Sequence, residues 1–549
     1  MLHVERTEND QDAFAPGPRV AGLRGHAIRS GVRSSDSETD AQCPQSDAQC
    51  RTPYLDAVAG LADSHPLQIM VPGHGGTADH GGHHLADVYG ERMVQLDVPL
   101  MLEGVDLGDD SPLNESLALA AEAWGARRTW WLTNGASQGN RTAAFAVRGL
   151  GERVLMQRSS HSSFTDGVLL AGLIPAFVNP NVDQQHGIAH GLTPEMLEEA
   201  LRAEAEAGRA VQSVYVVSPS YFGSTADVAG LSRVAHAYDA ALIVDGAWGA
   251  HFGFHPDLPE SPARLGGDLV ISSTHKLAGS LTQSAMLHLG EGPFAERLEP
   301  LVKRAYTMTA STSASSILMG SLDAARHALV HGGEQISESV KISEEFRERL
   351  RADSRFSVIS DGFDAFPDIV ATDPLRVPID VSALGQSGHW VRDRLIADHN
   401  VYFEMSTGTS IVAVIGALAT PDLERIMDAL TAVADQADAL RAAGGVADQN
   451  GFPPLPAAGV LRMIPRSAFF GESEIVPASE AVGRVSSDTL AAYPPGIPNL
   501  VPGEEITEET VSFLQAVAGS PTGYVRGAVD PRVAQFRVVR DPVTASQQG

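Results

Sequence analysis

A lysine follows a short apolar run in the sequence SSTHK, residues 272–276. The run, Leu269 to Ser272, has the composition of a buried β-strand, so the lysine is predicted to lie just beyond a strand end. An amine placed among hydroxyls and a histidine is typical of a lysine that forms an imine beside a bound phosphate. Pyridoxal 5'-phosphate (PLP) carries both the aldehyde and the phosphate that such a site would hold. Taken alone, the lysine is better explained as a solvated surface charge.

A carboxylate stands at the end of the preceding apolar run, where Asp245 follows residues 240–244. PLP chemistry needs such a carboxylate beside the pyridine nitrogen, because a protonated ring accepts electrons from the substrate. Ala247, two residues later, is small enough to let one face of a planar ring approach the backbone. Lysine and aspartate together therefore favour a PLP site.

Two more polar motifs follow predicted strands. Residues 133–140, TNGASQGN, form a glycine-rich turn before a helix, where backbone N–H groups and a serine can cradle a phosphate. The alternative is an ordinary strand-to-helix turn with a capping residue. His161 follows the strand candidate Arg153 to Met156, and its ring could stack on a planar cofactor or simply be a satisfied histidine.

Residues 74–84 contain four histidines and Asp79, a composition that can bind zinc or nickel. The segment has no cysteine and lacks the fixed spacing of a catalytic zinc motif, and its glycines are typical of a flexible loop. We expect no metal site here.

Strand-like and helix-like stretches alternate from about residue 115. This alternation predicts an α/β fold with a parallel or mostly parallel sheet covered by helices on both faces. Ligands of such sheets bind at the carboxyl ends of the strands, where all the candidate residues fall. The strand candidates are residues 129–132, 153–156, 174–178, 213–217, 241–244 and 269–272, and helices are expected at 116–124, 194–207 and 228–238.

The chain of 549 residues is too long for a single ordinary core. Its first 50 residues lack hydrophobic periodicity and are predicted to be a disordered tail. Residues 51–330 are expected to form the large cofactor-binding domain, and 331–441 a smaller α/β domain with long helices at 333–353 and 421–443. A Gly- and Pro-rich linker at 442–457 leads to a carboxy-terminal α+β domain at 458–549.

The formal charge of −29 disfavours nonspecific binding to nucleic acid or to an anionic membrane. No signal peptide or apolar run of transmembrane length is present in the sequence. The two cysteines, Cys43 and Cys50, lie in a polar segment, and we interpret them as part of a tail rather than a disulfide framework or a catalytic pair. These features predict a cytoplasmic protein.

The order of these motifs resembles that of the Orn/Lys/Arg decarboxylases, a PLP-dependent family with the aspartate aminotransferase-like fold (fold type I). VPGH at 71–74 resembles the family's VPGHKGG, and SPSYFG at 218–223 its SPTYYG. DGAWGAH at 245–251 resembles DEAHGAH, and STHK at 273–276 is identical to the family sequence. Matches continue through SLDAAR at 321–326 and PPGIP with LVPGE at 494–504, so that the resemblance covers about residues 52 to 540.

The resemblance implies decarboxylation of lysine, ornithine or arginine to the corresponding amine, as in polyamine biosynthesis. It also implies that Lys276 holds the cofactor as a Schiff base, that Asp245 pairs with the pyridinium, and that His161 stacks on the ring with Ala247 or Trp248 nearby. Lys276 or His275 would return the proton to Cα. The phosphate would be surrounded by Ala136, Ser137, Gln138, Ser273 and His275.

The amino acid's cationic side chain needs an acidic partner, and Glu504 in the PGE motif is the first candidate. The alternative for Glu504 is a cap on a helix that starts near Thr507. The family also implies a homodimer with shared active sites, in which residues 311–313 reach the neighbouring phosphate. Departures from the family pattern at Gly75, Ala136 and Ser162, two of which replace lysines, put the substrate in more doubt than the cofactor.

Two other functions are compatible with the residues. Cofactor residues alone do not select the bond that breaks, so aminotransfer, aldol-type cleavage or oxidative deamination remain open. A non-catalytic relative is the third reading, and the presence of both Lys276 and Asp245 argues against it.

Overall fold

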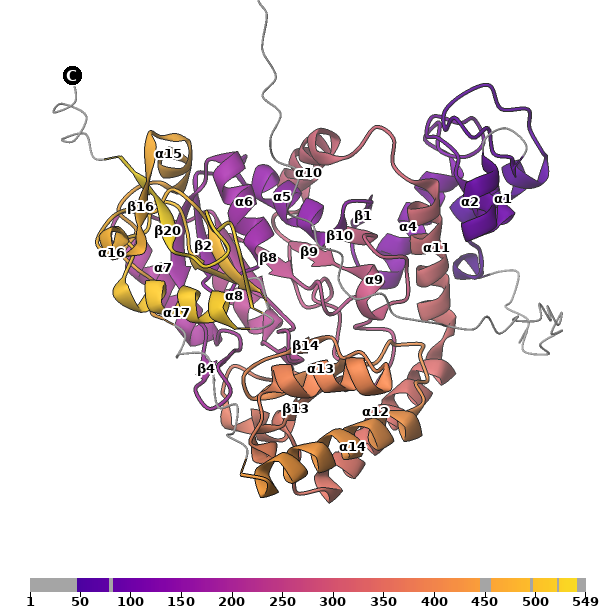
Figure 1. Cartoon of the computed structure of the whole chain (residues 1–549). Helices are drawn as coiled ribbons and strands as arrows, with labels where there is room; N and C mark the ends of the chain where they lie inside the picture. The colour runs from indigo at the N-terminus through magenta and orange to yellow at the C-terminus, as the bar shows by residue number, and fades with distance from the viewer. Residues whose placement is uncertain (1–46, 79–81, 445–455, 494–496, 521–522, 541–549) are drawn as a thin grey trace, which may run out of the picture. The chain divides into compact units, whose positions relative to one another are not determined.

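The computed structural model describes residues 47–78, 82–444, 456–493, 497–520 and 523–540. All elements described below belong to one unit, Ala48–Gly549 (Figure 1). The predicted tail lies outside the described residues except for its last four, three of which form the 3-10 helix η1 (Ala48–Cys50).

A seven-stranded mixed sheet forms the centre of the fold, in the order β1-β10-β9-β8-β6-β2-β3. β9, β8, β6, β2 and β3 run parallel, whereas β10 pairs antiparallel with both β9 and β1. The predicted α/β class and mostly parallel sheet are confirmed, and β10 is a strand that the sequence pattern did not reveal. The strands are β1 (Arg128–Leu132), β2 (Arg153–Gln157), β3 (Ile174–Val178), β6 (Ser213–Val217), β8 (Ala241–Asp245), β9 (Leu269–Ser272) and β10 (Ala285–Leu289).

Helices cover both faces of this sheet because its strands are apolar on both sides. In β8, Ala241 and Ile243 pack in one core and Leu242 and Val244 in the other, as expected of side chains that alternate along a strand. The first core includes α5 (Gly135–Val147), α6 (Ser162–Ala171) and α10 (Ala295–Thr309). The second includes α7 (Pro194–Glu206) and α8 (Val228–Ala237). Burial on both faces fixes the strand ends that carry Asp245 and Lys276.

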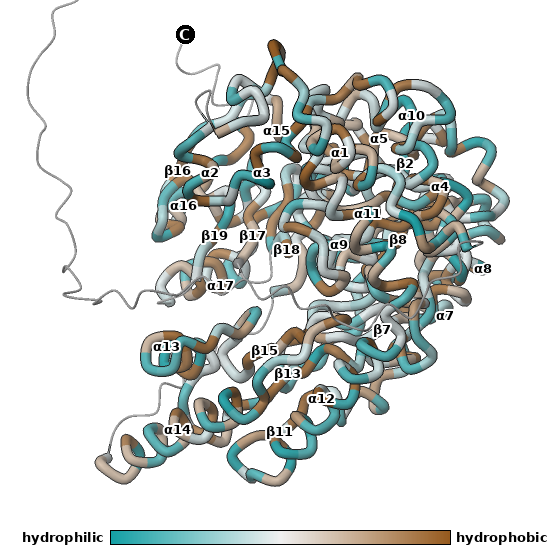
Figure 2. The backbone as a smooth tube through the Cα atoms, turned by 90° about the vertical axis from the view of Figure 1, so that its right-hand side faces the viewer, coloured by the Kyte–Doolittle hydropathy of each residue, from teal (hydrophilic) through white to brown (hydrophobic). Residues whose placement is uncertain are grey.

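A second, four-stranded antiparallel sheet has the order β11-β13-β15-β14. Its strands share an apolar core with three helices, along which polar and apolar residues alternate (Figure 2). Arg376 opens the longest run of pairs, between β13 and β15. The elements are β11 (Ser357–Val358), β13 (Arg376–Asp380), β14 (Met405–Ser406), β15 (Ser410–Val414), α12 (Gly333–Ala352), α13 (Gly388–His399) and α14 (Leu423–Ala442), with η3 (Ile359–Ala365) and η4 (Ser382–Leu384) between them.

Small sheets make up the carboxy-terminal region: β16 pairs with β20, and β17 lies between β18 and β19. Of the linker predicted at 442–457, residues 445–455 lie outside the described residues. The elements are α15 (Pro465–Phe470), β16 (Ser473–Pro477), α16 (Ala478–Ala481), β17 (Leu490–Tyr493), β18 (Ile497–Leu500), α17 (Glu508–Gly519), β19 (Tyr524–Arg526) and β20 (Gln535–Val539).

Shorter elements connect these sheets. The hairpin β4 (Val182–Asp183) and β5 (Ile188–Ala189) follows β3, and β7 (Ser224–Thr225) pairs with β12 (Ala371–Thr372). The remaining helices are α1 (Pro53–Asp63), α2 (His83–Tyr89), α3 (Glu91–Leu96), α4 (Pro112–Trp124), α9 (Thr274–Leu277) and α11 (Ser316–His331). None of the helices in the described ranges is long and apolar enough to cross a bilayer.

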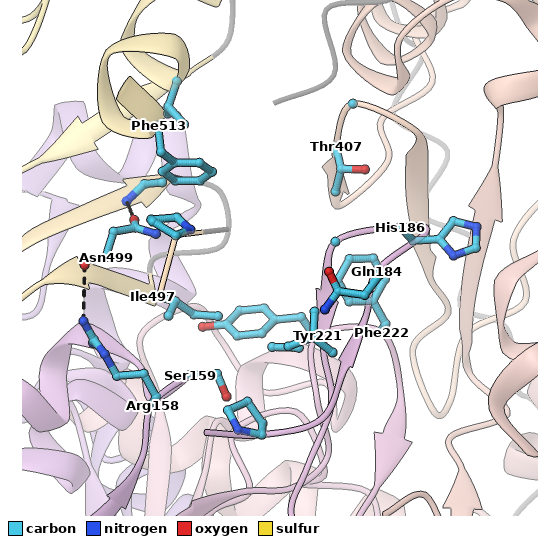
Figure 3. Close-up of a pocket in the computed structure, with 18 of the residues that line it drawn as sticks. Arg158, Ser159, Gln184, His186, Tyr221, Phe222, Thr407, Ile497, Asn499 and Phe513 are labelled. Atoms are coloured by element: carbon cyan, nitrogen blue, oxygen red, sulfur yellow. Dashed lines mark hydrogen bonds between the residues drawn. The ribbon is translucent and has the colours of Figure 1, made fainter. Parts of the chain in front are cut away.

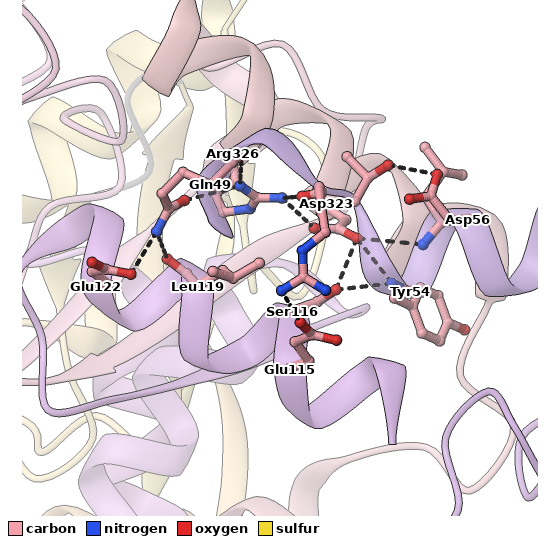
Figure 4. A network of polar contacts seen from close by, with 12 residues as sticks. Gln49, Tyr54, Asp56, Glu115, Ser116, Leu119, Glu122, Asp323 and Arg326 are labelled. Carbon is pink, nitrogen blue, oxygen red and sulfur yellow. Dashed lines mark hydrogen bonds and ion pairs between the residues drawn. The ribbon is translucent and has the colours of Figure 1, made fainter. Parts of the chain in front are cut away.

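The described chain starts with a segment held by a buried polar network (Figure 4). Asp323 accepts hydrogen bonds from the Tyr54 N–H (3.1 Å) and the Ser116 hydroxyl (2.8 Å) and pairs with Arg326 (3.0 Å). Arg326 also donates to the carbonyl of Gln49 (2.8 Å), so α11 binds the segment before α1. Cys50 lies in η1 and is disulfide-bonded, which corrects the interpretation of the cysteines as part of a tail rather than a disulfide framework; Cys43 lies outside the described residues.

We expect Asp323→Ala to destabilise the fold, because Arg326 would become a buried cation without its carboxylate. Breaking one side of a buried ion pair costs about 3–5 kcal/mol. Thermal unfolding should show this as a fall in the melting temperature. Exposed Asp435→Ala, which removes a surface pair with Arg355, serves as the control and should change the midpoint little. A midpoint for Asp323→Ala equal to that control would refute a structural role for the network.

Candidate active site

Lys276 lies on α9, directly after the buried strand β9, as the sequence predicts. Its Nζ lies 3.5 Å from the centre of the Trp248 ring. Burial lowers the pKa of Lys276 to about 7, with Arg376 acting in the same direction and Asp245 and Glu404 opposing it. A large fraction of this amine is therefore neutral and nucleophilic near pH 7, which is the form that attacks a carbonyl.

Asp245 ends β8 and is 4% exposed. Its Oδ2 accepts hydrogen bonds from the Tyr215 hydroxyl (2.5 Å) and from Asn140 Nδ2 (3.0 Å). Burial and the nearby Asp245 charge raise the pKa of Tyr215, so the phenol keeps its proton and donates. Among the residues that the structure describes, Oδ1 accepts only a longer bond, from the Ala247 N–H (3.2 Å), and an oxygen with two lone pairs has room for another donor.

His161 immediately precedes α6 and caps it, because its Nδ1 accepts the N–H of Ser163 (3.2 Å). Burial lowers the pKa of His161; Lys276 and Arg526 also lower it, and Asp245 opposes them. The ring is therefore neutral, which suits stacking on another flat ring. Arg526 of β19 donates to the Ser162 hydroxyl and to Asp166 (3.2 Å), so a cation from the carboxy-terminal region lies at the position where the family carries a lysine.

The first turn of α5 presents backbone N–H groups beside half-buried Ala136 and Ser137, and no acidic residue lies in that turn. Gln138 is buried, and its side chain accepts the Asn134 N–H (3.2 Å). On the other side, buried Ser273 and Thr274 start α9, and Thr274 Oγ1 has no hydrogen-bond partner among the described residues. His275 Nδ1 lies 2.9 Å from the Ser284 carbonyl, which fixes its proton there and leaves Nε2 free to accept.

These residues fit PLP. The free acceptor position on Asp245 Oδ1 suits a pyridinium N–H, the neutral His161 ring suits a stacked partner, and the unpaired Thr274 hydroxyl with the α5 N-terminus suits a phosphate. When bound, the cofactor supplies a ring that accepts the electron pair of the breaking bond.

Glu504, the predicted substrate-binding residue, is held by Arg158 and Val501. Its carboxylate is 1% exposed and pairs with Arg158 (3.0 Å), and it also accepts the Val501 N–H (2.9 Å). Burial raises the pKa of Glu504, and Arg158 opposes the rise. Thr507, and not Glu504, caps α17. The substrate-binding role of Glu504 stays a prediction, and the contacts in the structure are those of a structural ion pair.

Two charged residues near Lys276 were missed by sequence reasoning. The centre of the Arg376 guanidinium lies 3.7 Å from the Trp248 ring centre. Glu404, exposed just before β14, is among the charges that shift the pKa of Lys276, Arg376 and His275. Arg376 is the only charge in the apolar stretch LRVPI, and Glu404 is the only charge in YFEM. A single charged residue in an apolar stretch is unusual and could have drawn attention to both.

A cavity of about 580 Å³ adjoins this cluster through Tyr221 (Figure 3). The Tyr221 ring lies 6.0 Å from the Trp248 ring and points toward Ile497. The cavity is lined by the β4–β5 hairpin, by residues 405–409 and by the carboxy-terminal region. Its volume is within the range of small-molecule sites.

A mostly parallel sheet with a lysine, an aspartate and a helix N-terminus at its strand ends defines a fold type I PLP enzyme. The sequence matches the family models "Orn/Lys/Arg decarboxylase, major domain" over residues 52–410 and "Orn/Lys/Arg decarboxylase, C-terminal domain" over residues 461–522. The chain belongs to this family, whose members depend on PLP and decarboxylate basic amino acids.

Individual relatives of the chain carry the names of decarboxylases. An arginine decarboxylase of Bacillus subtilis is 32% identical over 505 residues, which cover 90% of this chain and 99% of the relative. An arginine decarboxylase of Halalkalibacterium halodurans is also 32% identical, with 90% and 98% covered. Among solved structures, lysine decarboxylase A of Pseudomonas aeruginosa superposes with a TM-score of 0.77 at 22% identity, covering 90% of this chain and 81% of that one, which supports the fold.

Proposed function

We propose that the protein converts L-arginine to its decarboxylated amine, with Lys276 as the residue that binds PLP covalently. The observation that carries the proposal is the enclosed Lys276 amine, whose pKa is lowered to about 7 beside the buried carboxylate of Asp245. The choice of arginine over other basic amino acids is supported by the arginine decarboxylases at 32% identity over nearly their whole length.

Each residue of the cluster has a separate task in this proposal. Asp245, held by Tyr215 and Asn140, keeps a proton on the cofactor's ring nitrogen. Ser273 and His275 lie with Ala136, Ser137 and Gln138 around the phosphate, and His161, Ala247 and Trp248 border the ring. Lys276 delivers the proton to Cα after carbon dioxide has left, or His275 does so once its Nε2 has accepted a proton.

We further propose that Glu404 binds the cationic end of the substrate. Its carboxylate has no side-chain hydrogen bond or ion pair within the described ranges, and it is close enough to Lys276, Arg376 and His275 to raise their pKa values. A guanidinium can bind a single carboxylate through two parallel hydrogen bonds. Glu504 lacks this freedom because Arg158 already binds both of its oxygens.

Glu404→Gln should therefore raise KM for L-arginine by roughly 10- to 100-fold, the effect of losing a charge-assisted hydrogen bond, while kcat changes less. The measurement is steady-state kinetics of carbon dioxide release. Glu504→Gln is the matched control: it weakens the buried pair with Arg158, so we expect a lower melting temperature and a nearly unchanged KM. If only Glu504→Gln alters KM, then Glu504 binds the substrate, as the sequence predicts, and Glu404 does not.

The function itself is tested by release of labelled carbon dioxide from a panel of amino acids with the purified, PLP-loaded protein. Release from L-arginine at a kcat/KM well above that for lysine and ornithine is the expected result. Faster turnover of lysine or ornithine would reassign the substrate within the family. Amino transfer or aldol cleavage with no release of carbon dioxide would contradict the proposed reaction.

We also propose a homodimer with shared active sites. Residues 67–107 expose an unusual number of large apolar side chains, among them Leu67 (83%), Ile69 (90%) and Val71 (71%). A second copy of the chain is the occupant that the family resemblance implies, and exposed residues 311–313 would then extend toward its site. Light scattering should give twice the mass of the chain, and Ile69→Glu should shift it toward the monomer.

Polyamine biosynthesis and a cytoplasmic location complete the proposal. The role in polyamine biosynthesis is supported by the basic amino acid chemistry of the family. Neither nucleic acid nor a membrane is expected as a partner, given the formal charge of −29.

A further inference from the structure

His161 and Asp245 are joined by a chain of buried hydrogen bonds. Asn140 Nδ2 lies 3.0 Å from Asp245 Oδ2 and 2.9 Å from the hydroxyl oxygen of Ser163. That hydroxyl oxygen lies 2.8 Å from His161 Nδ1. Asn140 and Ser163 are each 1% exposed, so solvent does not compete for these bonds. Two residues that the proposed function places against the cofactor ring are therefore linked through the protein interior.

Each hydrogen bond in this chain runs in one direction only. A carboxylate can only accept, so the NH2 group of Asn140 donates to Asp245, and its second proton goes to the Ser163 oxygen. The Ser163 hydroxyl then donates its own proton to His161 Nδ1. The backbone N–H of Ser163, which can only donate, also points to Nδ1 (3.2 Å). His161 Nδ1 therefore accepts two hydrogen bonds and carries no proton.

The neutral His161 ring consequently has its proton on Nε2, which makes no hydrogen bond among the described residues and offers a donor at the free edge of the ring. His275 has the opposite arrangement, since its Nδ1 binds the Ser284 carbonyl (2.9 Å) and leaves Nε2 as an acceptor. A second proton on His161 could go only to Nδ1, where it would break both bonds from Ser163. The same two bonds thus orient the ring and oppose its protonation.

We propose that Ser163 is a positioning residue that fixes the tautomer of His161 and, through Asn140, couples the His161 ring to Asp245. The proposal rests on the proposed function only for the contact between His161 and the cofactor ring. The tautomer itself follows from contacts within the protein, and it can be measured without PLP. Three residues, each from a different strand end or helix start, would then act as one unit with Asp245.

Ser163→Ala should raise the pKa of His161, because the lost hydroxyl bonds only to the ring without a proton on Nδ1. Burial has the largest effect on this pKa and lowers it, and four charged groups act as well, two that lower it and two that raise it: Lys276 and Arg526, and Asp245 and Asp166. None of them is altered by the substitution. Because the neutral ring is the form that stacks, the loss of decarboxylation at acid pH should move to higher pH, with kcat at neutral pH reduced roughly tenfold or less.

The direct test is nitrogen-15 NMR of the full-length protein with labelled histidine, with and without PLP. Difference spectra against His161→Gln and His275→Gln isolate the signals of the two rings. We expect the proton on Nε2 in His161 and on Nδ1 in His275, and a pH titration of His161 with a higher midpoint in Ser163→Ala. A proton on His161 Nδ1 in the unmodified protein would overturn the proposal, and so would equal titration midpoints with and without the Ser163 hydroxyl.

Two further variants separate positioning from a general structural role. Ser163→Thr keeps the hydroxyl, so the His161 midpoint and the acid limit of activity should stay as in the unmodified protein, even if the added methyl group lowers the melting temperature. Ser232→Ala is the matched control: it removes another buried hydroxyl, one that binds the Gly266 carbonyl (2.8 Å), and should affect stability alone. An acid limit that shifts equally in Ser163→Ala and Ser232→Ala would refute the positioning role.

Asn140→Ala tests the coupling between His161 and Asp245. If the bonds form one chain, the double variant Asn140→Ala/Ser163→Ala should lose hardly more kcat than Asn140→Ala alone, because residues in one hydrogen-bond network are not independent. Losses that multiply would refute the coupling. Failure of the unmodified enzyme to decarboxylate any basic amino acid would refute the proposed function instead, whereas the NMR result on the PLP-free protein would still stand, so the two failures are distinguishable.

Discussion

Lys276→Ala should abolish decarboxylation and leave the protein unable to hold PLP covalently. Loss of a residue that forms the covalent intermediate lowers kcat by about 10⁶-fold in well-studied enzymes. The chain has only three lysines, and the other two, Lys303 and Lys341, are exposed on α10 and α12. Mass spectrometry of borohydride-reduced, digested protein should therefore find the cofactor on the peptide that contains Lys276.

Lys303→Ala is the matched control and should retain both the adduct and the activity. Attachment of PLP to the cofactor-free protein should also depend on pH in a specific way. Because the pKa of Lys276 is lowered to about 7, the neutral amine is lost only below that pH. The attachment rate should rise with pH up to about 7 and then level off, whereas an ordinary lysine would continue to gain reactivity up to about pH 10.4. An adduct on Lys303 or Lys341 would disprove the assignment.

Asp245→Asn should reduce kcat by roughly 10²- to 10³-fold, the usual effect of removing a preorganised electrostatic contact. The substitution keeps the size of the side chain but removes the charge that holds a proton on the ring nitrogen. The cofactor should remain attached to Lys276, so adduct formation and turnover separate in this variant. Stopped-flow and steady-state assays on the same preparation measure both quantities.

Tyr215→Phe provides the comparison for Asp245→Asn. It removes a donor to Asp245 (2.5 Å) and leaves the carboxylate in place, so we expect a loss of roughly tenfold or less, the size of one hydrogen bond. An Asp245→Asn enzyme with kcat equal to that of the unmodified protein would show that the carboxylate does not support the reaction.

The strands of the central sheet were predictable because each is identified by a run of neighbouring apolar residues. β8 and β9 are continuous apolar runs that end in Asp245 and in the SSTHK segment, and such runs identify strands buried on both faces. β10 escaped notice because His288 interrupts its apolar pattern, although this histidine is buried in the structure. A polar residue satisfied inside a core is indistinguishable, in sequence, from one in a loop.

The charges around the site were less predictable than the cofactor residues. Arg376 and Glu404 lie at least 100 residues beyond Lys276, and only the folding of the second sheet brings them beside it. Glu504 was a reasonable candidate from its motif, yet its partner Arg158 is 346 positions away in the chain. Contacts of such separation leave no periodic signal in the sequence.

The bonds from the carboxy-terminal region to the strand ends of the central sheet have a practical meaning for engineering. Arg158 binds Glu504 and the carbonyls of Pro498 and Asn499, and Arg526 binds Ser162 next to His161. A chimaera could replace the residues beyond 456 with those of a relative. Its two parts would then come from different proteins, and the charged residues that pair across them would no longer be matched. Such a hybrid should work only if the donor also supplies the residues at 158 and 162, and these two positions are therefore the first to transplant.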